Sequence, residues 1–220
     1  MKTLTTLFSL IFWTAFGCKA QTVGAWEDLS SLDKWRNFKS QTINQQWQPI
    51  KNGFMLRAKG GGDIITKDQY ENFELQLEWK ISPKGNSGIF FHVVENEKVN
   101  YVWESGPEMQ ILDNEGHPDG KIRTHRAGDN YDLHSCSVET VKPVGKWNKV
   151  KIIVNRGKVA YWLNGTKVVE YQLGSPEWEE LYRKSKFKDM PYYGKAGKGH
   201  IALQDHGDVV WFRNIRIRRL

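Results

Sequence analysis

A strict two-residue alternation runs from Phe73 to Ile81 and constrains the fold more than any other feature of the sequence. Apolar side chains at every odd position of this run alternate with Glu, Gln, Glu and Lys at the even positions. Period two is the repeat of a β-strand, so the run predicts a strand with one face in a core and the other in water. A sheet built this way must bury its apolar face against a second layer.

Turn signals separate further strand-like runs. Asn52-Gly53 and Asn164-Gly165 are predicted as hairpin turns, because both central positions of a type I′ turn need a positive φ. Asn155-Arg156-Gly157 predicts a third turn between two alternating runs. Alternation returns at 201–206 and at 211–218. Many strands joined by tight turns predict an all-β sandwich of two sheets.

Helical signals are scarce. Ser175 followed by Pro176 offers an N-cap and a first-turn proline, and the apolar residues that follow predict one short helix from Pro176 to Lys184. Residues 184–198 are rich in Lys, Gly and aromatic residues without periodicity, which predicts a long loop. Loops of this kind often line functional sites.

Residues 1–20 have the pattern of an export signal, with Lys2, an apolar core from Leu7 to Phe16 and small residues before Ala20. The apolar core is too short to span a bilayer. Cleavage after Ala20 and cleavage before Cys18 both fit. The segment before Cys18 resembles a bacterial lipoprotein box, which would attach lipid to Cys18, although Ala15 stands where that pattern usually has Leu. Both alternatives predict an exported protein, periplasmic or at the cell surface, with 21–220 as a single domain.

The charge and the cysteines exclude some classes of partner and site. The formal net charge is +7, but Lys and Arg are scattered and form no basic stripe with interleaved aromatics, so we expect no nucleic-acid partner. With Cys18 lipidated or removed, Cys136 stands alone, which excludes a disulfide framework and zinc-finger spacing. The sequence leaves the oligomeric state open.

Polar residues interrupt two apolar runs. The run 87–94 is apolar on both parities, as in a strand that is covered on both faces, and His92 is its one ionisable residue. In the next run, Glu108 and Gln110 share a face roughly 7 Å apart, close enough to hold one small polar ligand. Near the end of the chain, parity places Gln204 and His206 on one side and Asp205 on the other. A buried Glu needs a partner or a function.

Four ordered motifs carry a family resemblance. GNSGIF (85–90), GPEMQILD (106–113), GHIALQDHG (199–207) and FRNI (212–215) resemble the 3-keto-disaccharide hydrolase domain family, and the similarity extends over 60–66, 73–79 and 147–165. The resemblance implies a concanavalin A-like jelly-roll sandwich of two antiparallel sheets with a concave, sugar-binding face. It also implies an oligosaccharide or glycoside substrate in which C3 of a glucose unit is oxidised to a ketone.

The implied chemistry needs a small set of groups. A ketone at C3 acidifies the hydrogen on C2, so a base can remove it, the C1 substituent can leave by β-elimination, and water can add back. This route requires a general base, a stabiliser for the enolate oxygen and a proton donor. We predict Glu108 and His206 as the acid and base groups. The predicted substrate-binding residues are Asn86, His92, Gln110, Gln204 and Asp205. A divalent metal could hold the enolate, but no tight ligand motif supports one, and no other cofactor is evident.

Each assignment has a purely structural alternative. Glu108 could be a buried carboxylate tied to Arg57 or Arg123 in an ion pair. His92 could be a core histidine whose hydrogen bonds are satisfied by the fold. Asp205 could hold a turn through backbone N–H groups instead of touching substrate.

Two other functions also fit the sequence. Glu108 to Asp113 is similar to the E-x-D-x-x-E strand of laminarinase-type glycosidases, but Gln110 and Asp113 replace the second and third carboxylates. A retaining glycosidase needs two carboxyl groups about 5 Å apart, and Asp113 has the wrong parity for that. The same sandwich also serves as a carbohydrate-binding module without catalysis, because a fold does not decide a function.

Overall fold

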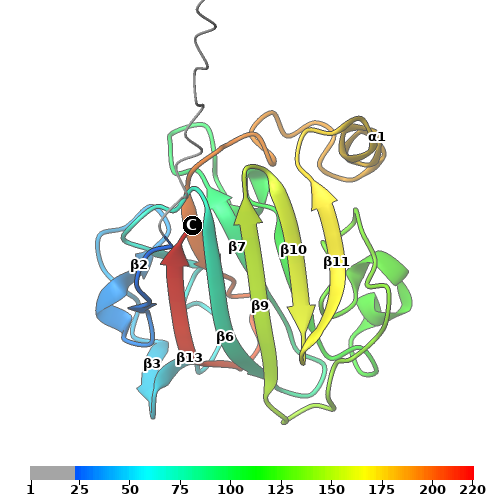
Figure 1. The fold of residues 1–220 in the computed structure, drawn as a ribbon. Helices are drawn as coiled ribbons and strands as arrows, with labels where there is room; N and C mark the ends of the chain where they lie inside the picture. The colour runs from blue at the N-terminus through cyan, green and yellow to red at the C-terminus, as the bar shows by residue number, and fades with distance from the viewer. Residues whose placement is uncertain (1–22) are drawn as a thin grey trace, which may run out of the picture.

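The computed structural model describes residues 23–220, and its strands form two stacked antiparallel sheets (Figure 1). The all-β sandwich with one short helix is therefore confirmed. The predicted export signal and the lipid attachment at Cys18 lie outside the described residues. No helix within 23–220 is long and apolar enough to cross a membrane.

The larger sheet has eight strands in the order β11-β10-β9-β6-β13-β4-β3, with β1 paired to β13. Its members are β1 (Glu27–Asp28), β3 (Trp47–Ile50), β4 (Gly53–Leu56), β6 (Phe73–Ile81), β9 (Asn148–Asn155), β10 (Lys158–Leu163), β11 (Thr166–Gln172) and β13 (Val210–Arg219). The smaller sheet has the order β2-β5-β12-β7-β8. It comprises β2 (Trp35–Asn37), β5 (Ile64–Thr66), β7 (Asn86–Val93), β8 (Glu108–Leu112) and β12 (His200–Leu203).

The hydrophobic core lies between the two sheets. All five odd-numbered residues of β6 are at most 2% exposed, as the alternation predicts. They belong to the same buried cluster as Ile89 and Phe91 of β7, Met109 of β8 and Ile201 of β12. The even-numbered residues of β6 point to the other side of the larger sheet, which leaves that side facing solvent.

Two of the three predicted turns have the expected geometry. Arg156-Gly157 and Asn164-Gly165 both carry positive φ between directly paired strands. The prediction for Asn52-Gly53 is wrong by one residue, because Ile50 pairs with Gly53 and the turn is Lys51-Asn52. A Cβ on Gly53 would lie 2.0 Å from the carbonyl oxygen of Phe212, so this glycine is needed for close strand packing and not for the turn.

The short helix α1 (Pro176–Lys184) has the predicted bounds, and the Ser175 hydroxyl accepts a hydrogen bond from the Trp178 N–H as its N-cap. The segment after α1 forms the predicted loop. Four short 3-10 helices lie in the connections: Leu32–Lys34, Val102–Glu104, Pro118–Lys121 and Arg123–His125.

Candidate active site

The pairing of β7 with β8 fixes the floor of the site. Phe90 lies opposite Glu108 and Gly88 opposite Gln110. Since Met109 belongs to the core between the sheets, Glu108 and Gln110 face the outer side of the smaller sheet. A second apolar cluster covers that side, and it consists of Ile65, Phe90, Val93, Val102 and Ala202. The two polar side chains therefore rise from a largely apolar surface.

The loop after β8 folds back along this strand. The Gln110 N–H donates to the carbonyl of Asp129, and the Tyr131 N–H donates to the carbonyl of Glu108. The loop after α1 is tied to it, because the Asp132 carboxylate accepts a hydrogen bond from the Lys186 N–H at 2.7 Å. The Lys186 ammonium lies 4.0 Å from the centroid of the Tyr131 ring. Two loops that are far apart in sequence therefore form the walls of the site above this floor.

A pocket of about 300 Å³ lies between the floor and these walls. Its lining residues are Asn86, Trp103, Glu108, Gln110, Tyr131, Lys186, Met190, Gln204 and His206. The structure therefore brings together five of the seven predicted site residues and leaves out His92 and Asp205.

The Glu108 carboxylate is buried and has no hydrogen bond or ion pair to any described residue; Glu108 is 4% exposed. The alternative that it pairs with Arg57 or Arg123 is not observed in residues 23–220. Burial raises the pKa of Glu108 to about 8, the nearby Lys186 ammonium opposes the rise, and the charges of Asp63 and Asp119 add to it. Burial also lowers the pKa of Lys186. An unpaired carboxyl with such a pKa can take up and release a proton near neutral pH.

Among the amides of the pocket, that of Asn86 has a free acceptor. The Oδ1 atom of Asn86 is buried and accepts no hydrogen bond from a described residue. The Oε1 atom of Gln110 accepts from the N–H of Ile111 at 3.0 Å. His206 is exposed, and its ring centroid lies 6.2 Å from that of His117. A buried acceptor without a partner is costly, so Asn86 is well placed to bind a ligand hydroxyl.

His92 does not reach the pocket, contrary to the prediction. Its φ is +53°, and the register between β7 and β12 shifts at this point. The resulting bulge turns the ring against Phe73 and Phe91, with centroid distances of 6.1 and 5.2 Å. The Nε2 atom lies 2.8 Å from the carbonyl oxygen of Glu71. His92 is thus buried outside the pocket, because a bulge reverses strand parity.

Asp205 holds a turn instead of lining the pocket. Its carboxylate accepts hydrogen bonds from the N–H groups of Gly60, Gly62 and Gly207, at 3.0, 2.8 and 2.8 Å. Its own N–H donates to the Asp63 carboxylate at 2.9 Å. These contacts fix the turn that carries His206, so Asp205 positions its neighbour.

Four lining residues were not predicted: Trp103, Tyr131, Lys186 and Met190. All four come from connections between strands, for which the sequence offers no periodicity. Trp103 is stacked on the exposed Tyr101, with ring centroids 5.1 Å apart and planes at 7°. This stacking holds the Trp103 indole at the edge of the pocket, where it offers an apolar face with one polar N–H. The aromatic and lysine-rich composition of 184–198 was the available signal for Lys186 and Met190.

Metal ligands do not cluster in the described part of the chain. Within 23–220 no three His, Cys, Asp or Glu side chains lie close enough to hold a metal ion together.

Comparisons with known proteins find relatives that cover most of this chain. A curated protein of Bacteroides thetaiotaomicron named 3-keto-disaccharide hydrolase is 34% identical over 222 residues, covering 88% of this chain and 77% of its own. A crystal structure of a proposed glycosyl hydrolase from Parabacteroides distasonis is 30% identical with a TM-score of 0.83, covering 90% of this chain and 94% of that one. A Bacillus subtilis protein with a galectin-like fold, 12% identical with a TM-score of 0.54 and covering 91% and 97%, shows the fold alone.

The family model for the 3-keto-alpha-glucoside-1,2-lyase-like domain matches residues 25–218. This range includes the whole candidate site and all the described strands except the last residue of β13. The protein therefore belongs to the family of 3-keto-alpha-glucoside-1,2-lyase-like domains.

Proposed function

We propose that the protein cleaves 3-keto-glycosides by removing the C2 proton, eliminating the C1 substituent and adding water. The observation that carries the proposal is the buried Glu108 carboxylate, which lies on the pocket floor without a partner in the described chain. The named relatives and the family description support the same class of substrate. We also propose that the protein is exported, as its first twenty residues predict.

Each proposed step balances in atoms and charge. The Glu108 carboxylate takes the proton from C2, and the C–H electrons form the enolate of C2 and C3. The Lys186 ammonium offsets the enolate charge, as preorganised cations do in water-poor sites. The enolate collapses, the C1–O bond breaks, and His206 donates a proton to the departing alcohol. The Glu108 carboxyl then exchanges its proton with solvent and protonates C2, while His206 takes a proton from the water molecule whose hydroxyl adds at C1, so both groups return to their starting states.

The geometry supports this route over a direct retaining glycosidase. Glu108 is the one carboxyl among the residues that line the pocket. The second candidate, Asp113, accepts hydrogen bonds from the N–H groups of Lys84, Glu115 and Gly116 and stabilises a turn outside the pocket. A retaining glycosidase needs two carboxyl groups about 5 Å apart across the scissile bond.

Solvent exchange tests the proposed elimination. A 3-keto-glucoside cleaved in D₂O should release 3-keto-glucose with deuterium at C2, and the unoxidised glucoside should not be cleaved. Product incubated in D₂O without enzyme controls for spontaneous exchange. Cleavage of the unoxidised parent, or a product that keeps its C2 hydrogen, would refute elimination. Binding of either sugar without turnover would indicate a carbohydrate-binding module without catalysis.

The pH dependence follows from the raised pKa of Glu108. The base must be ionised, so kcat/KM should rise with pH up to about 8, well above the range of an ordinary Glu. The activity should fall again at higher pH, because the proposed proton donor His206 and the Lys186 ammonium must both carry a proton, and burial lowers the pKa of Lys186. Lys186→Met removes the cation that opposes the increase in the pKa of Glu108. The acidic limb of the pH–rate profile should therefore move to higher pH. A lower limb near pH 4.5 in the wild type would contradict Glu108 as the base.

A further inference from the structure

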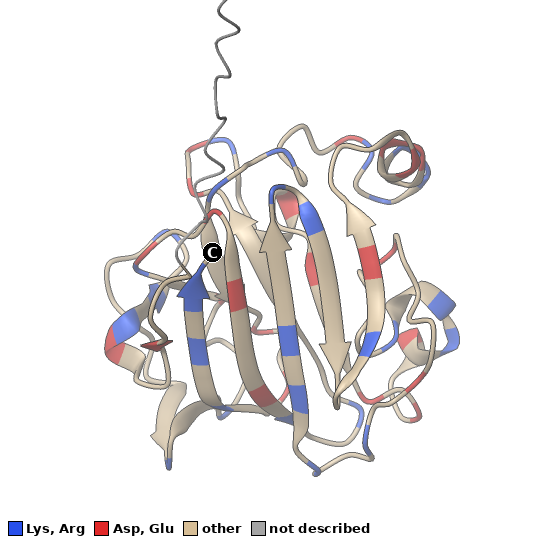
Figure 2. Ribbon diagram, viewed as in Figure 1, with Lys and Arg blue, Asp and Glu red and all other residues tan. Residues whose placement is uncertain are grey.

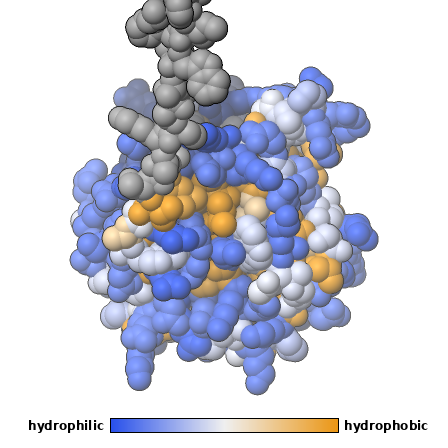
Figure 3. Space-filling view, viewed as in Figure 1, coloured by the Kyte–Doolittle hydropathy of each residue, from blue (hydrophilic) through white to orange (hydrophobic). Residues whose placement is uncertain are grey.

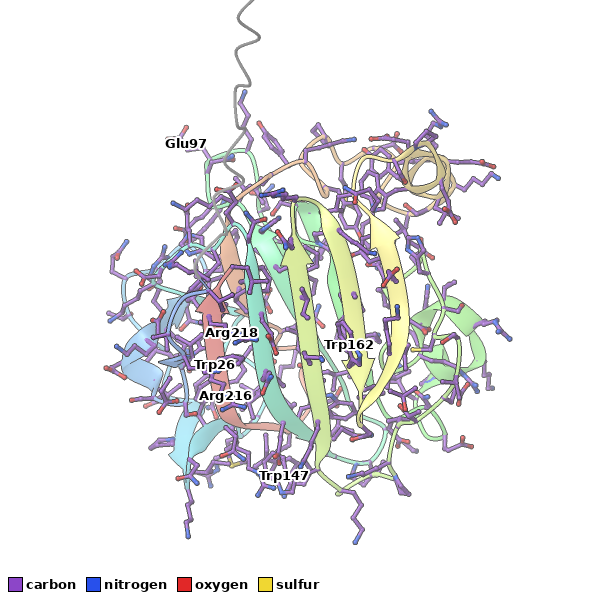
Figure 4. The ribbon with its side chains drawn as sticks, in the orientation of Figure 1. Trp26, Glu97, Trp147, Trp162, Arg216 and Arg218 are labelled. Carbon is purple, nitrogen blue, oxygen red and sulfur yellow. The ribbon has the colours of Figure 1, made fainter. Side chains whose placement is uncertain are left out.

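The outer face of the larger sheet carries a row of side chains that the proposed reaction does not use. Cross-strand pairing aligns Arg216 of β13 with Gln76 of β6, Gln76 with Lys151 of β9, and Lys151 with Trp162 of β10. Trp26, next to β1, lies at the β13 end of this row, while Trp162 lies across the sheet (Figure 4). Neighbouring strands are about 4.8 Å apart, so the row spans roughly 20 Å.

The row combines indole rings with cations. The Arg216 guanidinium lies 4.4 Å from the centroid of Trp26. At the other end, the Lys151 ammonium lies 3.9 Å from the centroid of Trp162. Between them, the Gln76 Oε1 atom accepts two hydrogen bonds from Arg216, at 2.7 and 3.1 Å. Both tryptophans are partly exposed. Each end of the row therefore offers an apolar ring and a positive charge together.

The carboxylates of this face are mostly neutralised by neighbours. Glu74 pairs with Arg218, Glu78 with Arg213, and Glu170 with Lys158 and Lys167. Figure 2 shows the resulting pattern, with basic bands on β13 and β9 on either side of acidic bands on β6.

Four cations of the face have no ion pair among the described residues: Lys80, Lys149, Lys151 and Arg216. The remaining acid, Asp28, lies opposite Arg216 in register and accepts a hydrogen bond from the Ser30 N–H. The face therefore carries a surplus of positive charge, and two of its four unpaired cations, Lys151 and Arg216, lie in the row.

A groove accompanies the row. A cavity of about 590 Å³ lies beside Trp26; its walls carry the cations Lys149 and Arg216 and the carboxylates Asp28 and Glu78, of which Glu78 is paired with Arg213. Hydrophobic side chains gather in the middle of this face with hydrophilic ones around them (Figure 3). The groove is separate from the candidate active site, because it lies over β6 and β13 of the larger sheet and the active site lies over β7 and β8 of the smaller one.

We propose that this row is a second binding site, for an acidic polysaccharide. Indole rings stack on the C–H faces of sugar rings. Arginine and lysine bind carboxylate or sulfate groups, with the guanidinium forming paired hydrogen bonds. A positive charge beside an indole at each end of a nearly straight row fits a linear polymer with repeated anionic groups. The shared ligand chemistry is the anionic sugar, whose charge is a uronate carboxylate or a sulfate ester.

Binding to three defined polymers tests the proposal. Polygalacturonate carries carboxylates, dextran sulfate carries sulfates, and dextran is the neutral parent of the latter. We expect at least one of the charged polymers to bind and dextran not to bind. The charged polymer with the higher affinity shows whether the site prefers carboxylate or sulfate. Arg216→Gln combined with Lys151→Gln should weaken this binding at least tenfold. The control pair Arg183→Gln with Lys98→Gln removes the same charge from exposed positions outside the sheet and should change it less than twofold.

Further measurements distinguish a sugar-binding site from a general cationic surface. Trp162→Ala should also weaken polymer binding, because stacking is part of the site. If the double variant fails to fold, Lys151→Gln alone replaces it in the binding measurement. The Lys151 side chain donates no hydrogen bond to a described residue, so we expect this single variant to fold. The proposal fails if neither charged polymer binds, if the double variant and its control behave alike, or if duplex DNA or phosphatidylglycerol vesicles bind as tightly with the same sensitivity. Unchanged kcat/KM of the double variant on a small 3-keto-glucoside would show that the two sites are separate.

Discussion

Glu108→Gln is expected to lower kcat on a 3-keto-glucoside by about 10³-fold, since removal of a general base costs about 10² to 10⁴ in rate. The amide keeps the shape of the side chain and cannot accept the C2 proton. Substrate affinity should change little, because Asn86, Gln110 and Trp103 remain in the pocket. Single-turnover rates together with calorimetric binding would measure both quantities. Undiminished turnover would remove Glu108 from the mechanism.

The same substitution should stabilise the protein at alkaline pH. The folded state raises the pKa of Glu108 to about 8 from an ordinary value of 4.5, so it binds the proton more tightly than the unfolded state. The stability that this proton provides is complete below pH 4.5 and is lost as the pH rises through 8. Since one pKa unit corresponds to about 1.4 kcal/mol, the loss is at most about 5 kcal/mol. Glu108→Gln does not titrate and avoids this loss.

Glu74→Gln is the matched control for both measurements. Glu74 is also a buried glutamate on a strand, but it forms an ion pair with Arg218 and accepts a hydrogen bond from Gln76. Its replacement should lower stability and leave kcat unchanged. Urea unfolding at pH 5 and pH 8.5 distinguishes the two variants. From pH 5 to pH 8.5, the free energy of unfolding of the Glu108 variant should increase relative to that of the wild type, whereas that of the Glu74 variant should not.

Gly88→Ala should lower kcat/KM at least 100-fold without changing any chemical group of the site. A Cβ at position 88 would lie 2.2 Å from Oε1 of Glu108, so the carboxylate must move. Misplacement of a catalytic group by about 1 Å costs on the order of 10² in rate. Gly197→Ala is the control, because a Cβ there meets no atom within 4 Å.

A double-mutant cycle tests whether Gly88 acts through Glu108. In the Glu108→Gln background, Gly88→Ala should cause little further loss, because two changes that act on one group are not additive. Additive losses would show that the alanine disturbs the pocket in some other way. Thermal unfolding of the single variant excludes a global loss of structure as the cause.

Local patterns predicted the long strands and much of the site floor. The alternation at 73–81 reports burial directly, because the two-residue repeat belongs to the backbone itself. The same repeat placed Glu108 and Gln110 on one face, and Asn86, Gln204 and His206 joined them in the pocket. The helix at Pro176–Lys184 followed from its N-cap and proline, which act within one turn.

The errors occurred where local repeats are interrupted. The bulge at His92 reversed the parity of β7. No residue in the run 87–94 predicts a positive φ at this histidine. The hairpin at Asn52 shifted by one residue because close contact between Gly53 and Phe212 decides the register. Both features depend on neighbouring strands that the local sequence does not contain.

The sequence by itself thus determined the long strands, the two-sheet sandwich and the residues that share the floor of the site, because side-chain alternation is a property of each strand alone. Tertiary structure alone decided that Glu108 has no partner within 23–220, that Lys186 and Tyr131 close the pocket above it, and that Arg216, Gln76, Lys151 and Trp162 form one row. These arrangements join segments tens of residues apart, and they exist only once strand register and long-range hydrogen bonds, such as that from Lys186 to Asp132, are in place.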